Sequence, residues 1–517
     1  MSNDALALQP LENRTVPDLL DRSASFGLDR VWVTEAQSGK VLHYGEFLER
    51  TAQTAHKLRA RFDPGSHIAM MQSNTIEFFI VRFAISVAGM VEVSLNGEQK
   101  GTVLKGMLET AQPIAFIVEE QYFGNLTGCG FDLSSSSLIV GGEIQALCAQ
   151  HSPWGERPQV DILPSDPCRI LFTSGTSGVS KGAVLSHAYE VYVGKAYADS
   201  DTLRGDDKFL YTTRLFHADA QFLISTLLHV GASFILMTHF SASQFWPLAM
   251  RYGATSFLFV GTILAILIKG ENPPSGHKMR LAFGGGCPRP IWERWLEHTA
   301  IPVVEAFAMT ECIACTLNTL KNPKIGSQGK PLAGYQVAVV DQYDRKLASG
   351  ERGEIVIRSE EPFALMSGYL NNPQATLERY RNLWFHTGDM GSMDEEGWLY
   401  FHGRLKDALR VKGENVSAEE LQNIADDHES IVSTAAVGVA SEMGDEEILL
   451  YVQPKPGRTI DPQQLCEFIA GRAVAFMVPR YIRLVESLPR SVSEKVSKTT
   501  LSRQPDEKTW ERPDAVR

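Results

Sequence analysis

Short apolar runs alternate with amphipathic segments along most of the chain. From about Phe47, runs such as His67–Met71 and Ile114–Val118 are separated by segments in which apolar residues recur at helical spacing. Apolar runs of this length favour strands, whereas the periodic segments favour helices. Regular alternation of the two is typical of layered α/β folds with largely parallel sheets. The same pattern predicts strands at Leu138–Val140, Phe234–Met237 and Ser256–Val260.

A different pattern occupies Gly334–Ile357. Here QVAVVD and EIVIRS alternate apolar and polar residues on the two sides of a turn-rich DRKLASGERG segment. Two alternating strands joined across Gly-rich turns indicate a small β subdomain. We expect this subdomain to cover about residues 325–403 and to form a distorted barrel.

A domain boundary is predicted after Gly403–Leu405. Beyond it, the pattern predicts helices and strands at Ala418–His428, Ala435–Val439, Ile448–Val452 and Pro462–Ala470. These elements make a compact α+β unit of ordinary domain size. We therefore expect an N-terminal domain of residues 1–405, which contains the β subdomain, and a small C-terminal domain of residues 406–517.

Composition narrows the class of protein. With 517 residues, 44% of them hydrophobic and 21% charged, the chain is globular and too long for one ordinary domain. Its net charge of −12 disfavours nucleic acid as a partner. Seven cysteines without dense spacing indicate a reducing compartment. No secretory signal is visible at the N-terminus, and the strongest apolar run, Phe257–Ile268, is too short to span a membrane. A cytoplasmic protein without membrane insertion is expected, and homo-oligomerisation is left open.

The sharpest chemical signal is LFTSGTSGVSKG, at 171–182. An apolar strand, Arg169–Phe172, leads into small and hydroxyl-bearing residues, which let backbone N–H groups approach an anion. Lys181 adds a positive charge that can reach a phosphate. The Walker pattern is excluded because Ser180 precedes the lysine and Gly182 follows it; a flexible surface loop is the alternative. The residues predicted to hold phosphate are Thr173, Ser174, Gly175, Thr176, Ser177 and Lys181.

This segment resembles the phosphate-binding loop of the adenylate-forming superfamily, which comprises acyl-CoA synthetases, luciferases and peptide-synthetase adenylation domains. The loop of that family usually reads TSGTTGxPKG. Here Ser177 replaces the second Thr, and Ser180 replaces Pro, which removes a rigidifying residue. Further motifs follow in the family's order across 173–495, so the resemblance covers nearly the whole chain.

One of these motifs, FAMTE at 307–311, resembles the family's YGxTE. The resemblance implies that Thr310 contacts phosphate and that Glu311 binds Mg²⁺, for which hydroxyl and carboxylate oxygens are suitable. Phe307 and Ala308 depart from the usual Tyr and Gly on the adenine or acyl side. Upstream, the glycine turn GGGCP resembles the segment along adenine, and a carboxylate could accept from the adenine amino group. The adenine residues implied are Gly285, Gly286, Glu305 and Phe307.

The remaining motifs lie toward the C-terminus. The resemblance implies that Asp389 of TGD accepts hydrogen bonds from the ribose hydroxyls, and that Arg404 of GRLKD lies near ribose and phosphate. It places Lys406 at an inter-domain hinge, Gly413 beside the pantetheine path, and Lys495 at the phosphates during adenylation. Catalytic roles are thus predicted for Lys495, Thr310, Glu311 and His217, the last as an aromatic gate of the acyl pocket rather than a core histidine.

Other patterns have simpler interpretations. Cys312-x-x-Cys315 has redox or zinc spacing, but a second ligand pair is not nearby in sequence, so two buried cysteines are expected. The acidic residues at 351–354 and 394–396 are expected in solvated turns rather than as acid/base pairs.

The resemblance implies an ATP-dependent acid–CoA ligase that uses ATP, Mg²⁺ and coenzyme A on a small carboxylic acid, with a C-terminal domain that rotates between half-reactions. The segments FHADAQ, FSASQFW and GENVSAEEL resemble carnitine or crotonobetaine–CoA ligases. Asp219 in the first of these suggests a substrate with a cationic trimethylammonium group; the alternative role for Asp219 is to cap a helix beginning near Ala220.

Two other functions stay open. One is an adenylation enzyme that loads a carrier protein, although the chain ends near residue 517 without a carrier domain, which favours CoA. The other is a non-catalytic nucleotide-binding protein, given the departures at Ser180, Phe307, Ala308 and Glu494.

Overall fold

A computed structural model describes residues 10–173, 180–200, 202–260, 263–270, 272–321, 323–405, 408–411, 414–440, 446–473, 477–490 and 496–513. The chain forms two compact units: residues 1–337 with 357–385, and residues 338–356 with 386–517. The division therefore passes through the predicted β subdomain. The domain boundary predicted after residue 405 stays a prediction.

The first unit contains a seven-stranded sheet. Its strands are β3 (His67–Met71), β4 (Val91–Ser94), β5 (Ala115–Val118), β6 (Ser137–Val140), β7 (Pro167–Thr173), β8 (Lys181–Ser186) and β18 (Gly368–Tyr369). Their order is β18-β8-β7-β4-β3-β5-β6. The strands from β7 to β6 run parallel, whereas β8 is antiparallel to both of its neighbours. The phosphate segment is thus a hairpin at one side of an otherwise parallel sheet.

A nine-stranded sheet completes the strand layers of this unit. Its strands are β1 (Val31–Glu35), β2 (Val41–His43), β9 (Lys208–Tyr211), β10 (Ser233–Leu236), β11 (Ser256–Val260), β12 (Leu281–Gly285), β13 (Val303–Met309), β14 (Cys312–Leu317) and β15 (Lys330–Pro331). Their order is β15-β14-β13-β12-β11-β9-β10-β1-β2. The central strands are parallel, and antiparallel partners lie at both edges.

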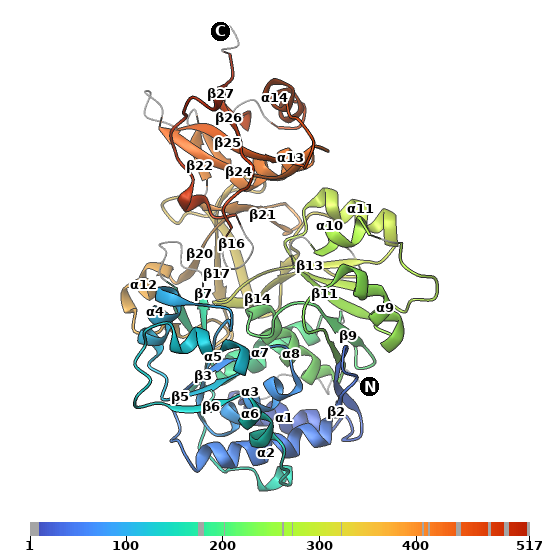
Figure 1. The fold of residues 1–517 in the computed structure, drawn as a ribbon, viewed down its shortest axis with the longest axis vertical. Helices are drawn as coiled ribbons and strands as arrows, with labels where there is room; N and C mark the ends of the chain where they lie inside the picture. The colour runs from blue at the N-terminus through green and yellow to red at the C-terminus, as the bar shows by residue number, and fades with distance from the viewer. Residues whose placement is uncertain are drawn as a thin grey trace. The chain divides into compact units, whose positions relative to one another are not determined.

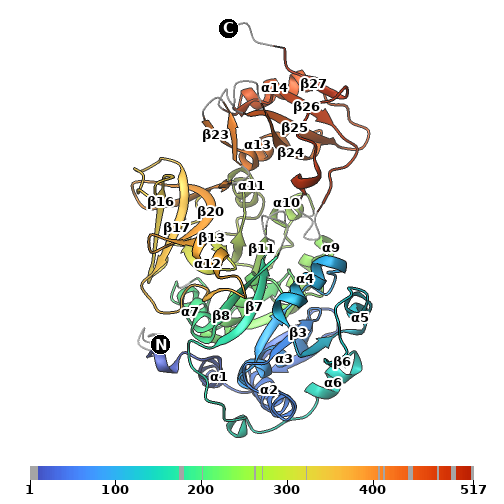
Figure 2. The same ribbon diagram turned by 90° about the vertical axis from the view of Figure 1, so that its left-hand side faces the viewer.

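Helices separate and cover these sheets (Figures 1 and 2). They are α1 (Val16–Ala24), α2 (Tyr44–Arg59), α3 (Ile76–Val87), α4 (Gly101–Ala111), α5 (Glu120–Thr127), α6 (Gly142–Cys148), α7 (His187–Ala198), α8 (Ala218–Val230), α9 (Ala242–Tyr252), α10 (Ile263–Ile268), α11 (Arg289–Thr299) and α12 (Pro373–Arg379). Helix α3 contacts β1 and β4, and α7 contacts β8 and β14, so both lie between the two sheets. Trp246 of α9 and Trp292 of α11 pack on the outer face of the nine-stranded sheet. The layered α/β architecture predicted from the sequence is confirmed.

A third sheet has the order β16-β17-β20-β19, with β21 paired to β20. Its strands are β16 (Tyr335–Val340), β17 (Gly353–Ser359), β19 (Tyr380–Arg381), β20 (Trp384–Met393) and β21 (Leu399–Arg404). The two alternating segments QVAVVD and EIVIRS are therefore strands, as predicted.

The second unit also contains the C-terminal part of the chain. Its elements there are β22 (Ala408–Val411), β23 (Glu414–Ser417), α13 (Ala418–Asp426), β24 (Ile431–Ala440), β25 (Glu446–Pro454), α14 (Pro462–Ala470), β26 (Tyr481–Leu484) and β27 (Thr509–Glu511). The last four strands form one sheet in the order β24-β25-β26-β27. Leu421 of α13 and Ile469 of α14 pack with Leu450 of β25 in a separate core, so the predicted α+β unit is confirmed.

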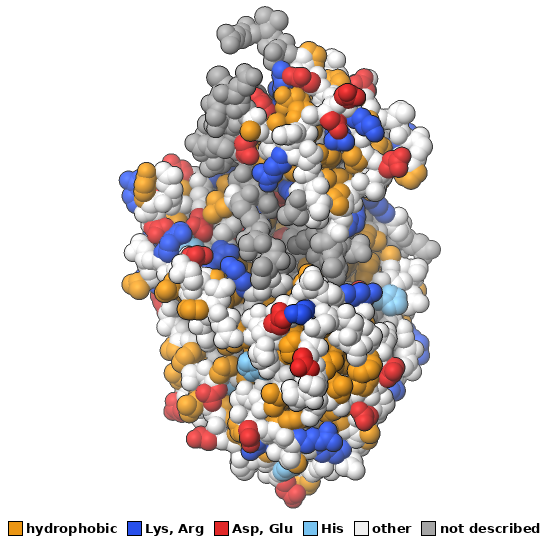
Figure 3. All heavy atoms as spheres, turned by 60° about the vertical axis from the view of Figure 1, so that its left-hand side comes forward, with side chains coloured by type: hydrophobic (Ala, Val, Ile, Leu, Met, Phe, Trp, Pro, Cys, Tyr) orange, Lys and Arg blue, Asp and Glu red, His pale blue; other side chains and the backbone are white. Residues whose placement is uncertain are grey.

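Two further observations concern membrane-spanning helices and the cysteines. Within the described residues, no helix is both long enough and apolar enough to cross a membrane. All seven cysteines are buried, and none forms a disulfide. On the face drawn in Figure 3, acidic and basic side chains are interspersed.

Candidate active site

The phosphate segment begins and ends on two paired strands. Thr173 at the end of β7 lies opposite Lys181 at the start of β8, and the Thr173 hydroxyl donates to the Lys181 carbonyl at 3.4 Å. The structure thus places both ends of the predicted loop. Four of the predicted phosphate ligands lie outside the described residues: Ser174, Gly175, Thr176 and Ser177.

Tyr369 joins Lys181 to the predicted metal ligand. It lies on β18, which pairs with β8, and its hydroxyl donates to Glu311 Oε1 at 2.6 Å. The Lys181 ammonium lies 5.3 Å from the centroid of the same ring. Burial, and then the negative charge of Glu311, raise the pKa of Tyr369, so the phenol stays a donor. Sequence analysis missed Tyr369, because its role depends on pairing with Ala183, a residue 186 positions earlier in the chain.

Thr310 and Glu311 form the turn of the β13–β14 hairpin, since Met309 and Cys312 are paired across it. Their backbone carbonyls are held from two sides. The Tyr189 hydroxyl donates to the Thr310 carbonyl at 3.1 Å, and the Met366 N–H donates to the Glu311 carbonyl at 3.0 Å. These two contacts fix the backbone of the turn that carries the predicted phosphate and metal residues. Mg²⁺ is usually bound by one or two carboxylates together with phosphate oxygens and water, and Glu311 beside Lys181 fits that donor set.

Glu305 organises the glycine turn predicted to meet adenine. From β13, its Oε1 accepts from the backbone N–H groups of Gly286 and Cys287, each at 2.9 Å. Gly284, which precedes this turn, lies close to the backbone of Phe259. A Cβ at position 284 would lie 1.9 Å from the Phe259 carbonyl oxygen. Glu305 is only 1% exposed, and its Oε2 has no hydrogen-bond partner. Burial raises the pKa of Glu305 to about 7. An unpartnered buried acceptor at this position fits an adenine amino donor.

The adenine and acyl residues are distributed over two elements. Phe307 is buried on β13, two residues beyond Glu305, and its N–H donates to the Thr316 hydroxyl at 3.3 Å. His217 is exposed and is the N-cap residue of α8, with its ring 4.2 Å from that of Phe216. The described structure thus leaves the predicted gate role of His217 untested.

Asp219 does not cap α8, and that alternative is wrong. The helix begins at Ala218 rather than near Ala220, its N-cap residue is His217, and Asp219 lies in its first turn. Its Oδ2 accepts from the Thr213 hydroxyl at 2.7 Å, whereas its Oδ1 is shielded from solvent and has no hydrogen-bond partner. Burial raises the pKa of Asp219, and nearby His217 opposes this shift.

In the second unit, Asp389 and Arg404 lie opposite each other on β20 and β21, and Arg404 Nε lies 2.8 Å from Asp389 Oδ1. Glu354 supports this motif. Its Oε1 accepts from the Gly388 N–H at 3.0 Å, and its Oε2 lies 2.8 Å from His386 Nδ1. The prediction of a solvated turn is therefore wrong for Glu354, although it holds for the exposed Glu351.

Three predicted residues of the second unit lie outside the described residues: Lys406, Gly413 and Lys495. In the first unit, Cys312 and Cys315 are both buried on β14, as expected.

Comparison with known proteins places the chain in a family. The model described as "AMP-binding enzyme" matches residues 20–370, and that described as "AMP-binding enzyme C-terminal domain" matches residues 420–495. The crotonobetaine/carnitine–CoA ligase of Escherichia coli (strain SE11) is 27% identical, over 93% of this chain and 97% of that protein. The protein of the same name from Proteus mirabilis (strain HI4320) is 28% identical, over 91% and 95%.

Solved structures agree with this assignment. The crystal structure of ATP-bound MatB from Rhodopseudomonas palustris superposes with a TM-score of 0.85 at 25% identity, over 94% of this chain and 98% of that one. The order of the motifs, the two clusters around Glu311 and Asp389, and a family model that spans more than half of the sequence lead to one conclusion. The chain belongs to the AMP-binding enzyme family and is an AMP-forming acid–thiol ligase.

Proposed function

We propose that this enzyme activates a small carboxylic acid as its acyl-adenylate and then transfers the acyl group to coenzyme A. The observation that carries the proposal is the Lys181–Tyr369–Glu311 arrangement, in which a cation and a carboxylate meet one phenol beside the Thr310 turn. A site for triphosphate and Mg²⁺ needs these groups together, and they come from two strands and a hairpin turn that are far apart in sequence.

In the first half-reaction, a carboxylate oxygen of the acid attacks the α-phosphate of ATP and pyrophosphate leaves. Lys181 and Lys495 offset the negative charge that gathers on the phosphates. Thr310 would contact phosphate, and Glu311 would hold Mg²⁺, which when bound supplies further positive charge to the phosphate oxygens. Tyr369 keeps Glu311 in place by donating to Oε1, which leaves the other carboxylate oxygen for the ion.

Recognition of the nucleotide is assigned to the residues that the family motifs name. Glu305 Oε2 accepts from the adenine amino group along the turn of Gly285 and Gly286. Asp389 accepts from the ribose hydroxyls, and Arg404, whose Nε lies 2.8 Å from Asp389 Oδ1, contributes a positive charge beside them. In the second half-reaction the thiol of coenzyme A attacks the mixed anhydride, with Gly413 beside the pantetheine and Lys406 at the hinge.

The acid itself is proposed to carry a positive charge. Asp219 presents a carboxylate oxygen that is shielded from solvent and has no hydrogen-bond partner. A carboxylate oxygen that is shielded from solvent and lacks a hydrogen-bond partner is costly, and a cationic substrate would offset that cost. The capping role that would otherwise explain the residue is not observed. A quaternary ammonium acid, of the kind named for the similar carnitine ligases, meets this requirement.

Pyrophosphate release across a panel of carboxylates, with and without coenzyme A, tests the proposal. The panel pairs a betaine-type acid with a neutral acid of the same shape, in wild type and Asp219→Asn. We expect release with the betaine-type acid, thioester only when coenzyme A is present, and loss of the preference in Asp219→Asn. Asp207→Asn, which changes a carboxylate that is 2% exposed, should keep the preference. A wild-type preference for the neutral acid would exclude a substrate role for Asp219.

A further inference from the structure

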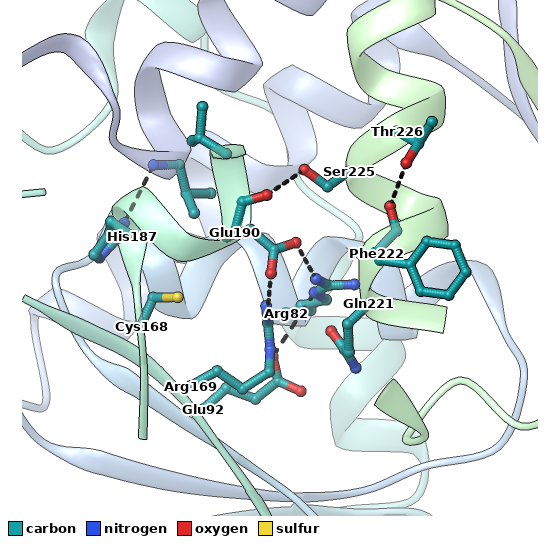
Figure 4. Close-up of polar contacts among 12 residues, drawn as sticks. Arg82, Glu92, Cys168, Arg169, His187, Glu190, Gln221, Phe222, Ser225 and Thr226 are labelled. Atoms are coloured by element: carbon teal, nitrogen blue, oxygen red, sulfur yellow. Dashed lines mark hydrogen bonds and ion pairs between the residues drawn. The ribbon is translucent and has the colours of Figure 1, made fainter. Parts of the chain in front are cut away.

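Four charged side chains are buried together between the two large sheets of the first unit (Figure 4). Arg169 Nε donates to Glu92 Oε2 at 2.8 Å, and Arg82 Nη2 donates to Glu190 Oε1 at 2.5 Å. Arg169 also pairs with Glu190. Each of these side chains is at most 2% exposed. We refer to Arg82, Glu92, Arg169 and Glu190 as the ion-pair cluster.

Fold stability does not explain the ion-pair cluster. Its hydrogen bonding is incomplete, because Arg82 Nε and Nη1, Arg169 Nη2 and Glu92 Oε1 are buried without hydrogen-bond partners. Removing charges from water is expensive, and a buried ion pair repays that cost only when every remaining donor and acceptor is satisfied. Apolar side chains of similar volume are often as stable or more stable at such sites. The ion-pair cluster therefore needs an explanation other than stability.

The cluster joins the two flanks of the phosphate hairpin. Arg169 lies on β7, four residues before Thr173, and Glu190 lies in the first turn of α7, the helix that follows β8. Their ion pair therefore closes a loop of chain that contains the whole phosphate segment. Glu92 connects Arg169 to the neighbouring strand β4, since the two residues lie opposite each other in the register of β4 and β7.

The cluster also connects to the helix that carries Asp219. The Ser225 hydroxyl of α8 donates to the Glu190 carbonyl at 2.7 Å, and His229 Nε2 lies 2.9 Å from the Val191 carbonyl oxygen. The two helices cross closely, because a Cβ at Gly194 would lie 2.3 Å from Ser225 Oγ. Figure 4 shows Glu190 between the arginines on one side and Ser225 on the other. Movement of α7 would thus be transmitted to the acyl side of the site.

We propose that the ion-pair cluster positions the phosphate hairpin relative to α8, so that the α-phosphate of ATP and the substrate carboxylate meet in line. The inference rests on the proposed function, which assigns phosphate to the hairpin and the acid to α8. The four residues are positioning residues, since they act through the hairpin and the helix. Small displacements of reacting groups reduce turnover strongly even when both substrates still bind.

The test replaces one cation and one anion together. Arg169→Met with Glu190→Leu leaves Arg82 and Glu92 as a neutral pair, so the variant is expected to fold with a melting temperature within about 5 °C of wild type. Its kcat for carboxylate-dependent pyrophosphate exchange should fall about 10- to 100-fold, with the KM for ATP changed less than about threefold. Thioester formation from supplied acyl-adenylate should stay within about twofold of wild type, because it does not use the hairpin.

A matched control removes a second ion pair of the same unit. Arg280 pairs with the buried Asp207 before β12 and β9, away from the phosphate hairpin. The variant Arg280→Gln with Asp207→Asn should keep kcat within about twofold of wild type. The inference is overturned if the cluster variant folds and keeps wild-type kcat, if both half-reactions fall together, or if the control loses kcat equally.

Hydrogen exchange separates this inference from the proposed function. Amide protons of β7 and β8 should exchange faster in the cluster variant than in wild type or the control, with no substrate present. If wild type releases no pyrophosphate with any acid, the proposed function fails, and faster exchange confined to the cluster variant still supports the inference. Equal exchange in all three proteins would overturn it.

Discussion

Replacing Glu305 with glutamine removes a buried charge while keeping the acceptor that holds the glycine turn. The glutamine Oε1 can still accept from the N–H groups of Gly286 and Cys287. What disappears is a carboxyl group whose pKa is raised by burial from 4.5 to about 7. The unfolded chain ionises this group near pH 4.5, whereas the folded chain holds its proton until near pH 7.

The sign and the size follow from proton linkage. Between the two pKa values the folded state binds a proton that the unfolded state has released, so the free energy of unfolding falls as pH rises through that window. The full difference corresponds to about 3 kcal/mol, of which about 2–3 kcal/mol lies between about pH 5 and about pH 8. Relative to Glu305→Gln, wild type should therefore lose that amount of stability over this range. This loss of stability should be smaller when ATP is bound, because an adenine amino donor favours the ionised Glu305 carboxylate.

Urea unfolding of both proteins at about pH 5 and about pH 8, without nucleotide, measures the stability change. Calorimetric titration with ATP in two buffers of different ionisation enthalpy, near pH 6.5, measures proton release, which is expected from wild type and absent in Glu305→Gln. Glu293→Gln on the surface of α11, with a side chain 44% exposed, should behave as wild type in both assays. Parallel pH profiles for wild type and Glu305→Gln, or ATP binding without proton release, would refute the reasoning.

Three further outcomes are expected. Tyr369→Phe should lower adenylation about tenfold and raise the Mg²⁺ concentration for half-maximal rate, because Glu311 loses a charge-assisted hydrogen bond; an unchanged Mg²⁺ dependence would contradict this. Lys495→Ala should abolish most pyrophosphate release yet still convert supplied acyl-adenylate to thioester, as rapid-quench assays would show; equal loss of both steps would exclude a role confined to adenylation. Gly413→Trp should block the pantetheine path, so acyl-adenylate should accumulate in the presence of coenzyme A; normal thioester formation would show that the residue lies elsewhere.

Local pattern was enough to predict the parallel strands. His67–Met71 and Ser256–Val260 form strands with the predicted bounds, because a buried parallel strand is a continuous apolar run. Helix Pro462–Ala470 also has its predicted bounds, with Asp461 as its cap and Pro462 in its first turn. Strand β8 was not predicted, since KGAVLS is neither a continuous apolar run nor an alternating one. Pairing with β7 and β18 makes it a strand.

Only the site residues that lie in short sequence motifs could be predicted from the sequence. Glu311 and Asp389 stand in short motifs whose residue types already suit the chemistry. Tyr369 and Glu354 stand in no such motif, and their roles arise from contacts with Glu311 and with Gly388 that the chain makes after folding. An acidic residue near a turn reads as solvated unless its partner is known, which is why Glu354 was misinterpreted.

The burial of every native thiol makes the surface of the folded enzyme unreactive toward maleimides. A cysteine introduced on each compact unit would therefore accept a fluorescent dye with little background labelling and without prior removal of native cysteines. Energy transfer between the dyes, followed in stopped flow as ATP, acid and coenzyme A are added in turn, would time any rotation of the C-terminal domain. Whether that rotation precedes thiol attack or accompanies pyrophosphate departure then becomes a directly measurable order of events.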